Sequence, residues 1–286
     1  MRDETWTIIK ILRWTTAYFR SRHIDQPRTD AEVLLAYTLG LKRIELYTNY
    51  DKPLQDRELK HFKSLIQRRI LYEPVAYITG KKEFWSLELM VTPDVLIPRP
   101  ETECLVEAAL DVIPKDVNCD ILDLGTGSGA IILALAYERP GHRFYAVDLS
   151  EAAINIARKN AQCYGLGEKI TFLHGDWFKA VQNKRFDIIV ANPPYIPRHQ
   201  IETLLPEIVR YEPRHALDGG QDGLEAIRFI LRTAPKYLAP GGTVFLEIGY
   251  DQCPAIAAIA EGLGYKDFVC RKDYGGKDRV IRLAWR

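Results

Sequence analysis

The stretch ANPPYIP, residues 191–197, places an asparagine, two prolines and a tyrosine directly after a run of apolar residues. Adjacent prolines fix φ and remove two N–H donors, so this turn presents rigid hydrogen-bond acceptors and few donors. The side-chain oxygen of Asn192 and the carbonyl of Pro193 are therefore suited to accept the two hydrogens of an NH2 group. A strand that ends in a plain proline-rich loop is the simpler interpretation, and the flanking sequence must decide between the two.

A glycine-rich loop follows a second apolar run, in DILDLGTGSGAIILALA. Gly125, Gly127 and Gly129 stand between a predicted buried strand and a predicted helix, where missing side chains let a ligand approach the backbone. Such loops are typical of nucleotide sites, although a tight structural turn can have the same composition. The spacing is G-x-G-x-G, and Asp123 ahead of it would repel a pyrophosphate but suits a cationic amino acid moiety.

Further polar residues follow the next two predicted strands. Asp148, in YAVDLS, lies about twenty residues after the loop, where an acid accepts both hydroxyls of an adenosine ribose. A helix N-cap is the alternative role for Asp148, but Ser150 fills that position better. GDWF then offers Asp176 as an acceptor for an exocyclic amine and Trp177 either as an aromatic wall for adenine or as part of the core.

Short apolar strands alternate with amphipathic helices from Arg99 onward, which predicts an α/β domain of parallel strands joined by right-handed crossovers. Ligands bind at the carboxyl ends of such strands, where all the acids above are found. The tail, YKDFVCRKDYGGKDRVIRLAWR, predicts a final hairpin and hence one antiparallel strand. The strands are expected at residues 119–125, 143–149, 169–175, 185–192 and 242–249, with helices such as 129–139 and 150–165.

The N-terminal part has a different pattern. Apolar residues at helical spacing predict helices over residues 5–20, 29–40 and 56–72. Alternating polar and apolar residues on both sides of a TGKK turn then predict a β-hairpin. The expected domains are a helical substrate-recognition domain at 1–75, a hairpin linker at 76–98 and a catalytic domain at 99–286.

Composition limits the functions available. The 286 residues are 47% hydrophobic and carry a net charge of +1, so the chain lacks the global field of a duplex-binding or membrane-binding protein. Its five cysteines form no C-x-x-C pair and its six histidines show no ligand spacing, so neither a disulfide framework nor a metal is expected. Scattered thiols and the absence of a signal-peptide core favour a cytoplasmic protein.

The sequence resembles the class I S-adenosylmethionine-dependent methyltransferases that act on amino groups, because DLGTGSG, VDLS, GDWF and NPPY follow successive strands in this order. LIPRPETE before the domain and EPRHALDGGQDGLEAI after NPPY are similar to one family, the HemK/PrmC release-factor glutamine methyltransferases. This resemblance implies a Rossmann-like, seven-stranded, mostly parallel sheet with a C-terminal antiparallel hairpin, and a small N-terminal helical domain joined by a β-hairpin.

The same resemblance implies the reaction and the residues that carry it. The substrate would be a class 1 peptide chain release factor, methylated on the side-chain nitrogen (N5) of the glutamine in its Gly-Gly-Gln motif in support of translation termination, by an enzyme expected to be monomeric. Catalysis would fall on Asn192, Pro193 and Tyr195. The residues implied to bind S-adenosylmethionine are Asp123, Leu124, Gly125, Thr126, Gly127, Asp148, Trp177 and Asn192, and those implied to bind substrate are Asn192, Pro193, Pro194 and Tyr195.

The sequence is compatible with several alternatives. Arg99, Thr102 and Glu103 either help close the cofactor pocket or belong to a rigid linker and helix cap. A methyltransferase of exocyclic amines in DNA or RNA would use a similar turn, but it normally needs a basic groove to hold phosphates. A nicotinamide-dependent oxidoreductase is disfavoured by the glycine spacing and by Asp123. A release-factor or ribosome-associated scaffold that binds the cofactor without catalysis is disfavoured by the intact NPPY. The tripeptide GGQ at residues 219–221 is interpreted as a loop that leads into a helix.

Overall fold

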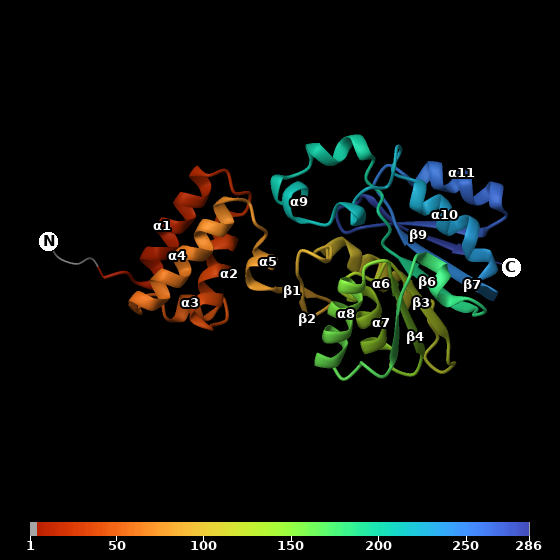
Figure 1. Cartoon of the computed structure of the whole chain (residues 1–286), viewed down its shortest axis with the longest axis horizontal. Coiled ribbons are helices and arrows are strands. Elements are labelled where there is room, and N and C mark those ends of the chain that lie inside the picture. Colours follow the sequence, from red (N-terminus) through yellow and green to blue (C-terminus); the bar gives the residue numbers. More distant parts are fainter. Residues whose placement is uncertain (1–4, 286) are drawn as a thin grey trace. The chain divides into compact units, whose positions relative to one another are not determined.

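The computed structural model describes residues 5–285, which form two compact units (Figure 1). The first unit contains the chain up to Gly80 together with residues 205–211, and the second contains the remainder. Within residues 5–285, no helix is both long enough and apolar enough to cross a membrane. The domain division expected from the sequence, with boundaries at residues 75 and 98, remains a proposal.

The first unit is helical. Apolar residues that recur at helical spacing along each helix form its core, and three of the helices contribute Phe19, Leu34 and Phe62. All three predicted helices are present. The second begins earlier than predicted, because Pro27 occupies its first turn, and it ends at Gly40 in the left-handed conformation. The helices of this unit are α1 (Ile8–Ser21), α2 (Pro27–Leu39), α3 (Glu45–Thr48), α4 (Asp56–Ile70), α5 (Val75–Thr79) and α9 (Pro206–Tyr211).

A buried arginine explains why α9, although it follows the NPPY stretch in sequence, belongs to the helical unit. The Arg69 side chain is only 4% exposed and lies 2.7 Å from carboxylate oxygens of both Asp30 on α2 and Glu207 on α9. The hydroxyl of Tyr211 also donates to the Leu71 carbonyl at 3.1 Å. Because a buried guanidinium is stable only when paired, these contacts attach α9 to the helices.

The hairpin β1 (Lys81–Phe84) and β2 (Leu87–Met90) is present, but its turn is not at TGKK as predicted. Gly80 instead ends α5, and the chain reverses at Trp85 and Ser86, whose φ angles are 52° and 59°. Such angles disfavour these residue types, so tertiary contacts must compensate. The backbone N–H of Trp85 donates to Glu103 at 2.8 Å, and its indole N–H donates to Glu138 at 2.9 Å.

The second unit is a seven-stranded sheet in the order β5-β4-β3-β6-β7-β9-β8, in which β9 runs antiparallel to the other six strands. The predicted α/β architecture with a C-terminal hairpin is therefore confirmed. The strands are β3 (Asp120–Leu124), β4 (Arg143–Asp148), β5 (Ile170–His174), β6 (Phe186–Ala191), β7 (Leu238–Glu247), β8 (Lys266–Lys272) and β9 (Asp278–Ala284).

Helices cover both faces of this sheet (Figure 1). Buried residues of α6 (Glu103–Leu110), α7 (Ala130–Glu138) and α8 (Glu151–Cys163) pack on one face, and those of α10 (Glu225–Thr233) and α11 (Cys253–Leu263) pack on the other. Alternate residues of each strand point to opposite faces, so Ile121 joins the first core and Leu122 the second. Short 3-10 helices lie at Pro100–Thr102, Trp177–Val181, Arg198–Thr203, Arg214–Ala216 and Ala234–Lys236.

Candidate active site

A cavity of about 440 Å³ lies at the carboxyl ends of the central strands of the second unit. Its volume falls within the usual range of small-molecule sites, about 300–1,000 Å³. The cavity wall brings together segments that are far apart in the sequence: residues 94–99, the glycine-rich loop, the ends of β4 and β6, and the start of α10. The structure therefore gathers the predicted motifs around one space, as expected for an open parallel sheet.

Four neighbouring strands each end in a polar residue directed to the same face of the sheet. Asp148 and Glu247 are the last residues of β4 and β7, Asp123 is the residue before the last in β3, and Asn192 directly follows β6. Each stands two positions after a residue of the core formed with α6, α7 and α8. Because side chains alternate along a strand, all four point toward that side. The sheet order β4-β3-β6-β7 makes them a continuous row.

The glycine-rich loop is fixed to β4 through backbone hydrogen bonds. The N–H groups of Gly125 and Thr126 both donate to the Val147 carbonyl, at 2.8 and 3.0 Å, and the N–H of Gly127 donates to a carboxylate oxygen of Asp148 at 2.8 Å. Gly125 and Gly127 have φ angles of 73° and 56°, which other residues rarely adopt. A Cβ atom at Gly127 would meet no atom within 4 Å, so the backbone there borders open space in the cavity.

Asp123 lies beneath this loop and is fully buried. The Thr126 hydroxyl donates to its Oδ2 at 2.7 Å, whereas its Oδ1 has no hydrogen-bond partner among the residues that the structure describes. Burial raises the pKa of Asp123 to about 7, and the nearby Asp148 carboxylate adds to the increase. An incompletely satisfied carboxylate next to the cavity wall favours a positively charged ligand, which fits the ammonium and sulfonium groups of S-adenosylmethionine.

Asp148 lines the cavity, and both of its carboxylate oxygens accept hydrogen bonds from the surrounding backbone. Oδ2 accepts from Gly127, and Oδ1 accepts from the N–H of Ser150 at 2.8 Å. Ser150, as predicted, is the N-cap of α8, because its side chain accepts from the N–H of Ala153 at 3.2 Å. Each carboxylate oxygen can accept a further bond, so Asp148 remains available to the hydroxyls of a ribose.

Replacing Asp148 with asparagine should weaken binding of S-adenosylmethionine about tenfold, because an amide turns an NH2 donor toward backbone N–H groups and carries no charge. Isothermal titration calorimetry measures this directly. Asp120→Asn is the matched control, since Asp120 lies at the opposite end of β3 and pairs with Arg143 at 2.5 Å. Equal affinity of the Asp148→Asn variant and the wild type would contradict a cofactor role for Asp148.

Two aromatic residues form the far part of the wall. Trp177 and Phe229 both line the cavity, with ring centroids 6.4 Å apart and planes inclined at 43°. Trp177 has a φ of 50°, and its partly buried side chain both lines the cavity and packs against the hydrophobic core. Asp176 also lines the cavity and pairs with Lys179 at 2.6 Å. The arrangement suits a flat heterocycle such as adenine.

The NPPY stretch divides between the cavity and the protein interior. Asn192 and Pro194 line the cavity, while Pro193 is buried and is not among the lining residues. Tyr195 lies outside the lining, and its hydroxyl donates to Glu247 at 3.2 Å. Burial, with the negative charge of Glu247, raises the pKa of Tyr195 above its ordinary value, so this phenol stays protonated as a donor. The catalytic and substrate-binding assignments of these four residues remain predictions.

Close backbone packing holds the NPPY stretch in place. The Ile196 N–H donates to the Leu217 carbonyl at 3.1 Å, and the Gly219 N–H donates to the Ile196 carbonyl at 2.9 Å. A Cβ atom at Gly223 would lie 2.4 Å from the Tyr195 carbonyl oxygen, which only glycine avoids. The internal GGQ tripeptide, residues 219–221, is thus a packed loop before α10, as predicted.

The PRPETE segment, residues 98–103, contributes three residues to the cavity wall, Pro98, Arg99 and Thr102. Arg99 forms an ion pair with the buried carboxylate of Glu212, which anchors the segment over the cavity. Thr102 accepts a hydrogen bond from the Asn192 side-chain nitrogen at 3.2 Å. Glu103 instead faces the hairpin turn and accepts from Trp85. Arg99 and Thr102 therefore belong to the cavity wall. Thr102 is also the N-cap residue of α6, but its side chain makes no capping hydrogen bond, so the helix-cap interpretation is not supported.

Glu247 is the site residue that the motif analysis missed. It is 1% exposed, and its carboxylate accepts from the Thr102 hydroxyl at 2.6 Å and from Tyr195. Burial raises the pKa of Glu247, while the Thr102 hydrogen bond and the positive charge of Arg279 oppose the increase. A signal was present in TVFLEIG, where an acid ends an apolar strand in the same way as Asp123 and Asp148.

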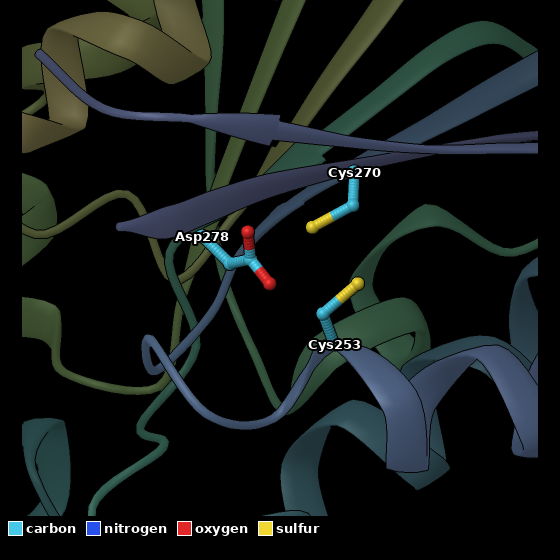
Figure 2. A group of neighbouring side chains, drawn as sticks. All are labelled: Cys253, Cys270 and Asp278. Atoms are coloured by element: carbon cyan, nitrogen blue, oxygen red, sulfur yellow. The ribbon is translucent and has the colours of Figure 1, made fainter. Parts of the chain in front are cut away.

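A separate cluster of possible metal ligands lies away from this cavity (Figure 2). The thiols of Cys253 and Cys270 and the carboxylate of Asp278 point toward one another, with ligand atoms within 4.8 Å. They come from α11, β8 and β9, and none of the three lines the cavity. Burial, followed by the neighbouring Cys253 thiol, raises the pKa of Cys270, which favours the protonated thiol over a metal-binding thiolate.

Comparison with known proteins identifies the family. Residues 10–80 match the family described as PrmC N-terminal domain, and residues 102–222 match the Methyltransferase small domain. The chain is 43% identical to the release factor glutamine methyltransferase of Geobacter sulfurreducens, covering 98% of this chain and 97% of the relative. It is 45% identical to the release factor glutamine methyltransferase of Coxiella burnetii, and the match covers 89% of this chain and 91% of the relative.

A solved structure supports the fold alone. The catalytic domain of hMettl16, in complex with MAT2A 3'UTR hairpin 6, aligns with a TM-score of 0.58 at 17% identity, over 82% of this chain and 84% of that one. The family to which the sequence relatives belong uses S-adenosylmethionine, and the cavity described above fits that cofactor. On the strength of identity that extends over nearly the whole chain, this protein belongs to the release factor glutamine methyltransferase family.

Proposed function

We propose that this protein transfers a methyl group from S-adenosylmethionine to the side-chain amide nitrogen (N5) of the glutamine in the Gly-Gly-Gln motif of class 1 peptide chain release factors. The single observation that carries the proposal is the position of Asn192. Its side chain lines the cavity while its nitrogen is already bound to Thr102, so its oxygen is left to accept from an amide NH2. The release factor as substrate follows from what the sequence relatives are named for.

When bound, the cofactor would supply a methyl group attached to a positively charged sulfur. The leaving group is this sulfur, which becomes a neutral thioether. The residues of this chain would hold it at the glycine-rich loop, Asp148 and Trp177. Asn192 would accept one N–H of the glutamine amide and the Pro193 carbonyl the other, which directs the nitrogen lone pair toward the methyl carbon. Methyl transfer would form a new N–C bond as the S–C bond of the cofactor breaks, and the nitrogen would then release one proton to solvent.

Catalysis in this scheme depends on acceptors more than on a base. The nitrogen gains positive charge as it is methylated, so its N–H groups become stronger donors and their bonds to Asn192 and Pro193 strengthen in the transition state. Two adjacent prolines keep these acceptors from moving away. The proton becomes acidic only after transfer, which is consistent with a site that needs no strong base.

The proposal is tested by incubating the protein with labelled S-adenosylmethionine and a purified release factor, and locating the label by mass spectrometry. Label is expected on the glutamine of Gly-Gly-Gln, and a release factor with asparagine at that position is the matched control, because its shorter side chain places the amide out of reach. Label on the control to the same extent would contradict the proposed acceptor.

Parallel reactions with DNA and with bulk RNA test the alternative, an exocyclic-amine methyltransferase. The net charge of +1 argues against the broad phosphate contacts that such substrates need, so little label is expected there. Label on nucleic acid alone would overturn the proposal. We further propose that the enzyme acts as a monomer, without direct contact with nucleic acid or membrane, in the cytoplasm where translation factors work.

A further inference from the structure

A chain of hydrogen bonds connects Asn192 to a buried acid on the next strand. The Asn192 side-chain nitrogen donates to the Thr102 hydroxyl oxygen at 3.2 Å, and that hydroxyl donates to Oε2 of Glu247 at 2.6 Å. Oε1 of the same carboxylate accepts from the Tyr195 hydroxyl at 3.2 Å. Glu247 is therefore connected to both ends of the NPPY stretch: indirectly to Asn192, through Thr102, and directly to Tyr195.

The direction of each bond follows from what the groups can donate. A carboxylate only accepts, so it orients the hydroxyl hydrogens of Thr102 and Tyr195 toward itself. With its hydrogen committed, the Thr102 oxygen can only accept from the third partner, which selects the NH2 end of the Asn192 amide. The oxygen end of Asn192 must then point elsewhere. Burial raises the pKa of Glu247, and the Thr102 hydrogen bond and the positive charge of Arg279 oppose that increase and favour the carboxylate form that this order requires.

We infer that Glu247, acting through Thr102, is a positioning residue that sets which end of the Asn192 side-chain amide faces the acceptor. Without it, the Thr102 hydroxyl is free to donate to the Asn192 oxygen, and the amide can turn its NH2 group toward the substrate. Two NH2 groups would then face each other, and the acceptor nitrogen would lose the hydrogen bond that orients it. This inference rests on the proposed function and adds specificity to it: the site favours an acceptor group that presents an NH2 donor to the Asn192 oxygen and disfavours one that presents a hydrogen-bond acceptor there.

The test compares Glu247→Gln and Thr102→Val with the conservative Thr102→Ser. Gln can donate as well as accept, and Val keeps the shape of Thr without its hydroxyl, so both should lower kcat about tenfold while the Kd for S-adenosylmethionine changes less than about threefold. Thr102→Ser keeps the hydroxyl, so its kcat should stay within about twofold of wild type. Glu261→Gln, on the exposed surface of α11, is the control.

Wild-type kcat in both Glu247→Gln and Thr102→Val would overturn the inference. A fall in kcat would also overturn it if the cofactor affinity falls by a similar factor and the temperature of unfolding decreases, because that result indicates a structural role only.

A second measurement does not depend on the substrate. In protein with ¹⁵N-labelled asparagine, the Asn192 NH2 signal, identified by its loss in Asn192→Asp, should show hydrogen exchange slowed severalfold relative to Thr102→Val. Equal exchange in the two proteins would contradict the hydrogen-bond chain even if the enzyme methylates glutamine. Slow exchange in a protein that fails to methylate glutamine would instead count against the proposed function and leave the chain supported.

Discussion

Replacing Asn192 with alanine should reduce turnover at least about a hundredfold while leaving the affinity for S-adenosylmethionine within about tenfold of wild type. A hundredfold loss corresponds to about 2.7 kcal/mol in the activation free energy, which is the magnitude found when one preorganised hydrogen-bond partner of a transition state is removed. The cofactor is held mainly by other segments of the cavity wall, so its binding should change less. Single-turnover methylation of a release factor and calorimetry of cofactor binding measure the two quantities separately.

Asn155→Ala is the matched control, because this asparagine lies exposed on α8. It should behave as wild type in both measurements. Turnover by Asn192→Ala that matches the control would remove Asn192 from the reaction. Asn192→Asp is informative as well, because it keeps an acceptor but loses the NH2 group that binds Thr102. Its turnover should fall between those of the wild type and the alanine variant.

The residues that the sequence identified best are those fixed by local geometry. The glycine-rich loop needs left-handed backbone at Gly125 and Gly127, and both residues have it. Asp148 and Asn192 could be placed at one edge of the sheet because parallel strands end at the same edge. Hydrophobic periodicity was enough to predict these strands, and the order of motifs along the chain then located the cavity.

What the sequence could not predict depends on contacts between distant segments. The hairpin turn at Trp85 and Ser86 contains neither glycine nor asparagine, and it is held by Glu103 and Glu138 instead of by its own residue types. The membership of α9 in the helical unit depends on Arg69, which pairs with partners 39 and more residues away. Local propensity carries no information about either contact.

The partners of Glu247 were hidden for the same reason. Its hydrogen bond to Thr102 spans 145 residues of sequence. An acid that ends an apolar strand could be noticed in the sequence, but its connection to Asn192 required the fold. The sequence indicates that the prolines make the NPPY turn rigid. The structure adds a buried carboxylate, Glu247, that orients the stretch from the protein interior.

Electrostatics of the cavity lead to a second large effect, on the pH dependence of cofactor binding. Burial raises the pKa of Asp123 to about 7, so in the protein without cofactor this carboxyl is largely protonated below pH 7. Its folded pKa exceeds the ordinary value of about 3.9, so folding takes up a proton between these two values. The stability that Asp123 contributes is therefore fully present below about pH 4 and is lost as the pH rises through 7.

Binding of a cofactor that brings ammonium and sulfonium groups close to this carboxyl should lower its pKa, because positive charges favour the ionised form. We therefore expect binding to release a proton and the affinity for S-adenosylmethionine to increase about twentyfold from pH 5 to pH 7, for a fall of about two units in the pKa of Asp123. Calorimetry in buffers of different ionisation enthalpy measures the proton release directly. Asp123→Asn has no proton to lose, so its affinity should be lower at pH 7 and nearly constant over this range. A wild-type affinity that does not change between pH 5 and 7, with no proton released, would show that the charges of the cofactor do not act on Asp123.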